Sequence, residues 1–171
     1  MTLVQVLARR RVALGFVTAV VAVFLARPTW MTWRWGFVVA LAGEALRIWA
    51  AGHLEKGREV TQSGPYRWTG HPLYVGSTLI AIGIVIASRS LILAALVAVY
   101  MVATLTAAVR TEEAFLRTTF GDAYVNYRDA RSAPVDRRFS LARAMRNREY
   151  RAAAGLLAGF ALLALKVGAS L

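Results

Sequence analysis

Long apolar blocks alternate with short polar and charged segments along this chain. The blocks are Val12–Ala26, Trp35–Ala51, Pro72–Ala87, Leu91–Val109 and Ala152–Leu165. A transmembrane helix needs about 20 apolar residues to cross about 30 Å of hydrocarbon, so flanking residues must complete the shorter blocks. The pattern predicts an all-α fold, a polytopic membrane bundle of about five transmembrane helices. An alternative is that one short block inserts only halfway.

The polar segments between the blocks determine how the helices connect. Only Ser88–Ser90 separates the third block from the fourth, so these two predicted helices are antiparallel and the chain returns to its starting side. Thr111–Arg128 is amphipathic and is expected to continue the fourth helix beyond the membrane. Residues 129–149 are basic and irregular, with a short interfacial helix expected over Ser140–Arg148. We predict a single integral-membrane domain over residues 1–171.

The first apolar block follows three arginines, Arg9–Arg11, an arrangement that also begins a signal peptide. A signal peptide ends in a cleavage site of small residues, and Phe24–Pro28 fits that pattern poorly. We therefore expect a retained first span.

The composition indicates a membrane protein and its orientation. The chain is 58% hydrophobic with a mean hydropathy of +0.51, which excludes an ordinary soluble domain. With five spans and a cytoplasmic N-terminus, 16 of the 21 lysines and arginines fall on the cytoplasmic side. This is the positive-inside pattern, and such a cluster also attracts anionic membrane lipids. The C-terminus is then outside. The arginine- and alanine-rich composition indicates a bacterial inner membrane.

The net charge of +12 and the absence of cysteine exclude further classes of function. No nucleic-acid-binding motif accompanies the charge, so we expect no nucleic-acid partner. A chain without cysteine has no disulfide, no thiolate nucleophile and no zinc–thiolate site. Two histidines are too few for a typical histidine-based centre, so we predict no metal.

Two charged residues interrupt the second apolar block. Glu44 and Arg47 are three residues apart and therefore share one helical face. We favour an ion pair inside the bundle. The alternative is a contact to the polar group of a ligand, which is the default hypothesis for ionisable residues within a membrane span.

Candidate chemistry gathers at one end of the predicted hairpin. His71 directly precedes Pro72, a residue favoured at the first position of a helix, whose free N–H groups can bind an anion. The rings of Tyr66 and Tyr74 attract cations such as a sulfonium, and Glu112–Glu113 adds negative charge where the fourth block ends. Together these groups predict a cytoplasmic pocket for a zwitterionic, sulfonium-bearing cofactor acting on a lipid-like molecule.

Each of these features also has a purely structural explanation. A His-Pro step commonly only starts a helix, and a pair of glutamates leaving a membrane is commonly a solvated face. Tyr124 and Tyr127 are more typical of interfacial anchors than of ligand contacts. Their joint spacing around one hairpin favours the functional interpretation.

The order of these motifs resembles the isoprenylcysteine carboxyl methyltransferase family. The motifs are Gly64–Tyr66, His71–Gly76, Glu112–Leu116 and Phe120–Tyr127. Membrane phospholipid N-methyltransferases share a related pattern. The resemblance covers a core of about residues 46–134.

The resemblance implies that S-adenosyl-L-methionine binds at the cytosolic membrane face and that a lipid-like substrate arrives laterally from the bilayer. By motif match, the implied cofactor-binding residues are Val60, Thr61, Tyr66, His71, Pro72, Leu73, Tyr74 and Glu112. A groove between the second, third and fourth helices is expected to admit the acceptor, and residues 129–149 are expected to cap the cofactor.

The chain departs from the family pattern at two arginine positions, where Gly70 and Ala108 stand instead. Arg110 is then the nearest candidate to hold the polar head of the acceptor. A carboxylate acceptor needs only positioning and removal from water, whereas an amine must first lose a proton, for which Glu113 is the candidate base. Arg110 and Glu113 are therefore the predicted catalytic residues.

The leading interpretation is carboxyl O-methylation of an isoprenylcysteine-like acceptor. Three alternatives stay open at this point. They are a phospholipid N-methyltransferase, an NADPH-dependent sterol-type membrane reductase and a non-enzymatic lipid-binding membrane protein.

Overall fold

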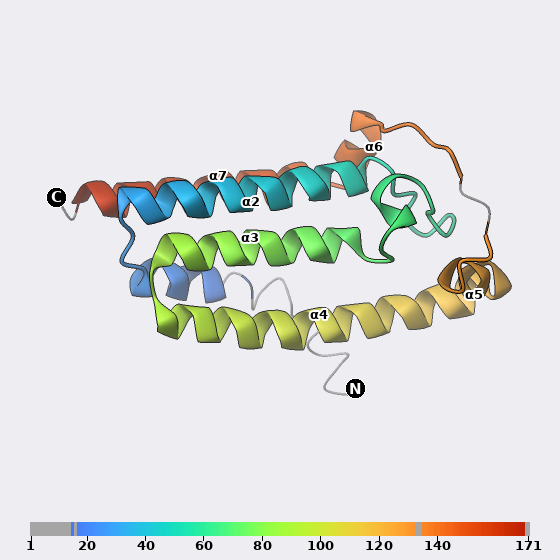
Figure 1. Cartoon of the computed structure of the whole chain (residues 1–171), viewed down its shortest axis with the longest axis horizontal. Coiled ribbons are helices and arrows are strands. Elements are labelled where there is room, and N and C mark those ends of the chain that lie inside the picture. Colours follow the sequence, from blue (N-terminus) through green and yellow to red (C-terminus); the bar gives the residue numbers. More distant parts are fainter. Residues whose placement is uncertain (1–14, 16, 133–134, 170–171) are drawn as a thin grey trace.

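The computed structural model describes residues 15, 17–132 and 135–169, and these form helices and loops without a strand. Residues 17–25 are helical. The elements that follow are α2 (Trp30–Ala51), η1 (Gly64–Arg67), α3 (Pro72–Ser88), α4 (Leu91–Phe120), α5 (Asp122–Arg128), α6 (Leu141–Arg146) and α7 (Tyr150–Ala169). The long helices run roughly parallel or antiparallel to one another (Figure 1). The predicted all-α class is confirmed.

The second predicted helix begins five residues before its apolar block. Thr29 caps α2 by accepting a hydrogen bond from the backbone N–H of Thr32 at 3.3 Å, and the Thr32 hydroxyl accepts one from the N–H of Thr29. This capping box satisfies N–H groups that the helix leaves free. The sequence pattern missed this start because Arg34 interrupts the apolar run.

The predicted hairpin of the third and fourth helices is confirmed. Arg89 ends α3 in the left-handed conformation with φ of 51°, and Ser90 caps α4 by accepting a hydrogen bond from the N–H of Leu93 at 3.3 Å. As expected, α4 continues past Val109, over 30 residues in all. Gly121, with φ of 47° and ψ of −122°, separates α4 from α5.

Glycines bring α2 and α3 into backbone contact. A Cβ at Gly36 would lie 2.4 Å from the carbonyl oxygen of Gly83, and a Cβ at Gly43 would lie 2.6 Å from that of Gly76. Small residues at such positions allow membrane helices to approach closely. We call these four residues the glycine seam. By contrast, α3 makes few contacts with α4, and the two helices diverge away from their turn (Figure 1).

The last helix packs along α2 and adds an aromatic core. The indole N–H of Trp33 donates a hydrogen bond to the carbonyl of Phe160 at 2.8 Å. The ring of Trp33 stacks on Phe37 and meets Phe160 edge-on, with centroids 5.0 and 5.9 Å apart. The chain beyond α6 is therefore an integral part of the bundle.

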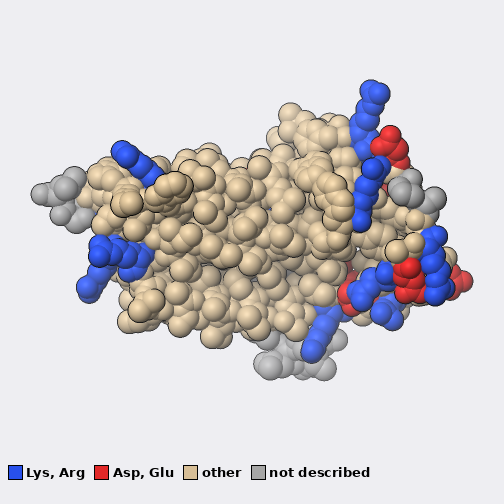
Figure 2. All heavy atoms as spheres, viewed as in Figure 1, with Lys and Arg blue, Asp and Glu red and all other residues tan. Residues whose placement is uncertain are grey.

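Two helices of the described chain, α4 and α7, are long and apolar enough to cross a membrane, and α3 is a shorter apolar helix. Many apolar side chains of these helices are exposed, including Val99, Val102 and Leu165. Charged side chains gather at the two ends of the molecule and leave a band between them free of charge on the face shown in Figure 2. These features are those of a membrane protein, in which lipid covers the apolar band.

Candidate functional site

A cavity of about 1070 Å³ opens where α3 and α4 diverge. Its wall comprises the end of α2, the loop that follows α2, the start of α3, one face of α4, part of α5 and the segment between α6 and α7. All eight predicted cofactor-binding residues line it, namely Val60, Thr61, Tyr66, His71, Pro72, Leu73, Tyr74 and Glu112. A single small ligand commonly occupies about 300–1,000 Å³, so this cavity has room for a cofactor together with part of a second ligand.

The structure brings His71 between the two glutamates of α4. The imidazole Nδ1 lies 3.7 Å from Oε2 of Glu112, and Nε2 lies 3.5 Å from Oε1 of Glu113. The first distance is too long for a hydrogen bond, so the attraction to Glu112 is electrostatic. These carboxylates, Glu112 foremost, raise the pKa of His71 above its ordinary value, although partial burial of the ring opposes the shift.

One polar atom of His71 has an electrostatic partner but no hydrogen-bond partner among the described residues. Its Nδ1 is buried and accepts or donates no hydrogen bond within the described residues. Buried polar atoms are nearly always paired, and an exception commonly marks the place of a ligand. No side chain caps the N-terminus of α3 either, so its first turn can bind an anion such as a carboxylate.

Among the described residues, five tyrosines line the cavity, namely Tyr66, Tyr74, Tyr100, Tyr124 and Tyr127. Tyr66 and Tyr124 are buried, and the hydroxyl of Tyr127 donates a hydrogen bond to the carbonyl of Tyr66 at 2.7 Å. Tyr124 packs inside the protein, unlike an interfacial anchor, and both Tyr124 and Tyr127 line the cavity, as the functional interpretation of their motif expects. The ring of Tyr74 stacks on His71, with centroids 5.6 Å apart. Burial, then the charge of Glu112, raises the pKa of Tyr66, so its hydroxyl remains neutral.

The segment between α5 and α7 fastens the loop that covers the cavity. Arg143 donates to the Glu55 carboxylate at 2.7 Å, and the Asn147 side-chain amide donates to the carbonyls of Ala51 and Leu54, each at 2.9 Å. The expected short helix is present as α6, which extends over part of Ser140–Arg148. Residues 135–149 thus hold the loop in place, and Asn147 also lines the cavity.

Val60 and Thr61 lie in this loop, in a non-helical stretch. The hydroxyl of Thr61 accepts a hydrogen bond from the N–H of Glu55 at 3.2 Å. Gly64 has φ of 57°, and a Cβ there would come within 2.6 Å of the His53 ring, so the loop requires glycine at this position. The same ring lies 3.1 Å from the Ser63 hydroxyl through its Nδ1.

The two predicted catalytic residues do not line the cavity. Arg110 is exposed on α4, away from the lining side chains. Glu113 pairs with His71 and with the guanidinium of Arg128, so its carboxylate already has two partners. The structure therefore places Arg110 apart from the eight residues that surround the cavity, whereas Glu113 contacts one of them, His71, without lining the cavity itself.

Sequence reasoning missed Glu149. Arg47, which the sequence pairs with Glu44 at i and i+3, lies 3.7 Å from that carboxylate. Its closer partner is Glu149, whose Oε1 accepts from Arg47 Nε at 2.6 Å. Arg47 also donates to the hydroxyl of Ser77, and it lines the cavity together with Ser77 and Glu149. Glu149 is the single acidic residue between residues 137 and 151, and that isolation was the available signal.

The described residues contain no group of three His, Cys, Asp or Glu side chains that could hold a metal ion. Their arrangement instead offers an open helix N-terminus, aromatic faces and a carboxylate at one cavity. These groups fit the carboxylate, sulfonium and ammonium of S-adenosyl-L-methionine.

A comparison with protein families finds one match, to the family described as Phospholipid methyltransferase, over residues 10–123. The matched stretch is two thirds of the chain and contains all eight cofactor-binding candidates. No curated protein matches the chain, and no solved structure does.

Proposed function

This chain belongs to the phospholipid methyltransferase family, and from that premise we propose that it methylates the headgroup nitrogen of a membrane phospholipid. It is a membrane enzyme that uses S-adenosyl-L-methionine. The observation that carries the proposal is a cavity that joins a polar loop region to the apolar face of α4. The family match thus favours the phospholipid N-methyltransferase alternative over the isoprenylcysteine reading of the motifs.

In this proposal the cofactor lies against the N-terminus of α3. The first-turn N–H groups of α3 bind its carboxylate, and Glu112 and His71 hold its amino-acid part. The rings of Tyr66 and Tyr74 face its positive charge. The remaining contacts come from Val60, Thr61, Pro72 and Leu73. The bound cofactor supplies an electrophilic methyl group on a sulfonium.

The acceptor approaches along α4. Met101, Thr104 and Leu105 line the cavity two to three turns before Glu112, on the part of the helix that the apolar pattern places in the membrane. Lipid chains can remain in hydrocarbon there while the headgroup meets the cofactor. The loop above and the helices around this space exclude water, which preserves the methyl donor for the lipid.

The second candidate is carboxyl O-methylation of an isoprenylcysteine-like acid. The motif resemblance supports it, and Lys56 and Arg67 are cations in the cavity wall that can bind a carboxylate. Membership of a methyltransferase family speaks against the reductase and the non-enzymatic alternatives.

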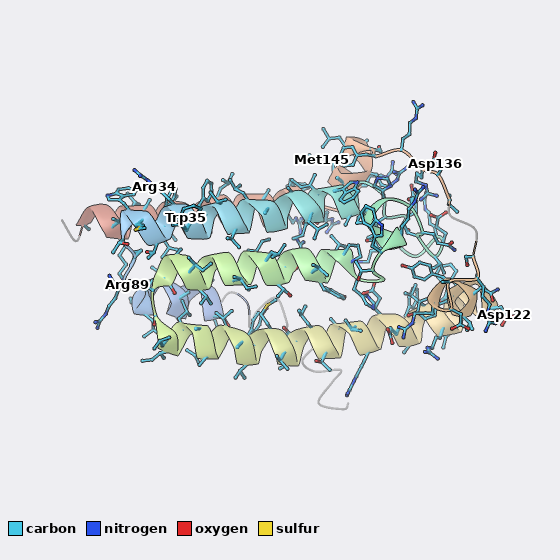
Figure 3. All side chains as sticks on the ribbon, viewed as in Figure 1. Arg34, Trp35, Arg89, Asp122, Asp136 and Met145 are labelled. Carbon is cyan, nitrogen blue, oxygen red and sulfur yellow. The ribbon has the colours of Figure 1, made fainter. Side chains whose placement is uncertain are left out.

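We propose a topology of five spans with the cavity and the N-terminus on the cytoplasmic side of a bacterial inner membrane. The support is the distribution of charge. Arg34 and Arg89 lie at one end of the molecule and Asp122 and Asp136 at the other (Figure 3). The cavity end carries most lysines and arginines, as the positive-inside pattern requires.

The test is a transfer assay with purified protein in lipid nanodiscs and methyl-labelled S-adenosyl-L-methionine. One set of nanodiscs contains phosphatidylethanolamine, and a second contains a farnesylcysteine acid in phosphatidylglycerol. We expect labelled N-methylated lipid in the first set. A base-labile methyl ester in the second, with no N-methylated lipid in the first, would establish the carboxyl acceptor instead.

A further inference from the structure

A buried ionic cluster in the cavity wall lies outside the proposed cofactor contacts. It consists of Glu44 and Arg47 of α2, Ser77 of α3 and Glu149, which directly precedes α7. Only 4% of Glu44 and 6% of Glu149 is exposed. Glu149 lies beyond residues 10–123, so the family match does not cover it.

The charges of this cluster do not balance when all three groups are ionised. Arg47 Nε and Nη2 both lie 2.6 Å from one oxygen, Oε1 of Glu149. Both carboxylate oxygens of Glu44 are buried without a hydrogen-bond partner within the described residues. No second Lys or Arg of that described part pairs with either glutamate. Since an uncompensated buried charge is costly, the cluster is neutral only with one further positive charge, either a proton on Glu44 or a cation from a ligand.

Glu149 shares the cavity with the cofactor candidates. Arg47 donates to the carbonyl of Leu73 at 3.3 Å, and Leu73 lies in the first turn of α3. The charges of Glu112 and Glu149 both contribute to raising the pKa of Tyr66, after burial. Tyr66 therefore interacts electrostatically with both carboxylates, that of Glu112 among the cofactor candidates and that of Glu149 in the ionic cluster.

We infer that Glu149, positioned by Arg47, binds the ammonium group of the acceptor and takes up the proton that the nitrogen must lose. The inference rests on the proposed function and specifies the acceptor as an amine. An ammonium supplies the positive charge that the cluster lacks. A carboxylate acceptor would instead meet a cluster whose one cation is already paired with Glu149.

The step balances in protons and electrons. One N–H bond of the ammonium breaks, its proton moves to the Glu149 carboxylate, and its electron pair stays on nitrogen. That pair forms the bond to the methyl carbon while the carbon–sulfur bond breaks, with its electrons left on sulfur. Glu149 then returns the proton to water once the product has left the cavity. Arg47 keeps the carboxylate in place throughout with its two donors.

The test compares Glu149→Gln with Asp122→Asn, a matched loss of charge at an exposed site. We measure kcat and KM for phosphatidylethanolamine, the affinity for S-adenosylhomocysteine, and the binding of short-chain phosphatidylethanolamine without cofactor. In Glu149→Gln we expect kcat to fall by about 100-fold or more, as for loss of a general base. Binding of the short-chain lipid should weaken about tenfold, because the ammonium loses its carboxylate partner. The affinity for S-adenosylhomocysteine should change less than about twofold, because Glu149 lies outside the proposed cofactor contacts. Asp122→Asn should match wild type.

Glu149→Asp covers the case in which the Gln variant does not fold. It keeps the charge but shortens the side chain, so we expect lipid binding near that of wild type with a reduced kcat. For the wild type, short-chain phosphatidylethanolamine should bind more tightly than short-chain phosphatidylglycerol, which lacks the amine. Equal binding of the two lipids would overturn the inference.

The inference and the proposed function fail in distinguishable ways. If wild type and Glu149→Gln methylate phosphatidylethanolamine at equal rates, the inference is wrong and the proposed function stands. If the wild type methylates only a carboxylate acceptor, both are wrong.

Discussion

The hydroxyl of Tyr127 donates a hydrogen bond to the backbone carbonyl of Tyr66, 2.7 Å away. This contact joins α5 to the loop that precedes α3. The same hydroxyl lies 3.5 Å from the carbonyl of Thr69. A single side chain thus holds two points of the loop that carries the cofactor-binding candidates.

Replacing Tyr127 by Phe should loosen this loop. The lost hydrogen bond leaves a carbonyl unpaired and should cost about 0.5–1.5 kcal/mol of stability. We expect a lower Tm in detergent and a several-fold weaker affinity for S-adenosylhomocysteine. Tyr150→Phe is the matched control, since Tyr150 is exposed at the start of α7. Equal effects of the two substitutions would show that the Tyr127–Tyr66 contact does not organise the site.

His71→Ala and Glu112→Gln should each weaken binding of S-adenosylhomocysteine. Loss of a hydrogen bond to a charged group costs roughly 1–3 kcal/mol, so the Kd measured by calorimetry should rise about 5- to 150-fold. Arg117→Ala serves as the control, because Arg117 is an exposed residue of the same helix, α4. Unchanged affinity in both variants would place the cofactor elsewhere.

Stability of the ligand-free protein should depend on the protonation of His71. Glu112 and Glu113 raise its pKa in the folded state above 6.5, so their stabilising contribution is complete below pH 6.5 and is lost as the pH rises through the raised pKa. We expect Tm to fall more steeply above pH 6.5 in the wild type than in His71→Gln. The comparison separates the effect of His71 from that of His53. Burial and nearby arginines lower the pKa of His53. Parallel curves for the two proteins would contradict the expectation.

The positions of the helices could be predicted because they rest on local patterns, whereas the eight cofactor candidates came from the motif resemblance. Apolar blocks located the helices, and His71 with Pro72 marked the start of α3. The partner of Arg47 could not be predicted in this way. Its pairing with Glu149 spans 102 residues and depends on how α7 packs on α2, which no local pattern specifies.

The position of Arg110 relative to Glu112 depends on helix geometry. Arg110 is the arginine nearest to the family position at Ala108, but side chains two residues apart on a helix point in directions about 200° different. Glu112 lines the cavity and Arg110 is exposed. Nearness along the chain was therefore a poor guide to a shared face.

Gly76→Ala should disrupt the contact between α2 and α3. A Cβ there would lie 2.5 Å from Cγ of Arg47 and 2.7 Å from the carbonyl oxygen of Gly43. Such overpacking costs about 1–3 kcal/mol and would also displace Arg47. Both Tm and activity should fall. Gly159→Ala on α7, where a Cβ meets no described atom within 4 Å, should leave Tm unchanged or raise it.

The proposed topology can be tested by labelling, because the chain has no cysteine. Asp122→Cys and Arg89→Cys place single thiols at opposite ends of the molecule (Figure 3). In intact cells we expect a membrane-impermeant maleimide to label Arg89→Cys, and to label Asp122→Cys only after the inner membrane is permeabilised. Labelling of both positions from the same side would refute the topology.

The length of α4 sets the depth at which the chemistry takes place. At 1.5 Å per residue its 30 residues extend about 45 Å, whereas the hydrocarbon layer is about 30 Å thick. Counted from Leu91 at one boundary, about 20 residues cross that layer, so it ends near Arg110. Glu112 then stands at the level of the lipid phosphates. Pulling two acyl chains into water would cost about 0.8 kcal/mol for each methylene. A methyl donor bound at the depth of the headgroups avoids this cost, because the lipid reacts without leaving its leaflet.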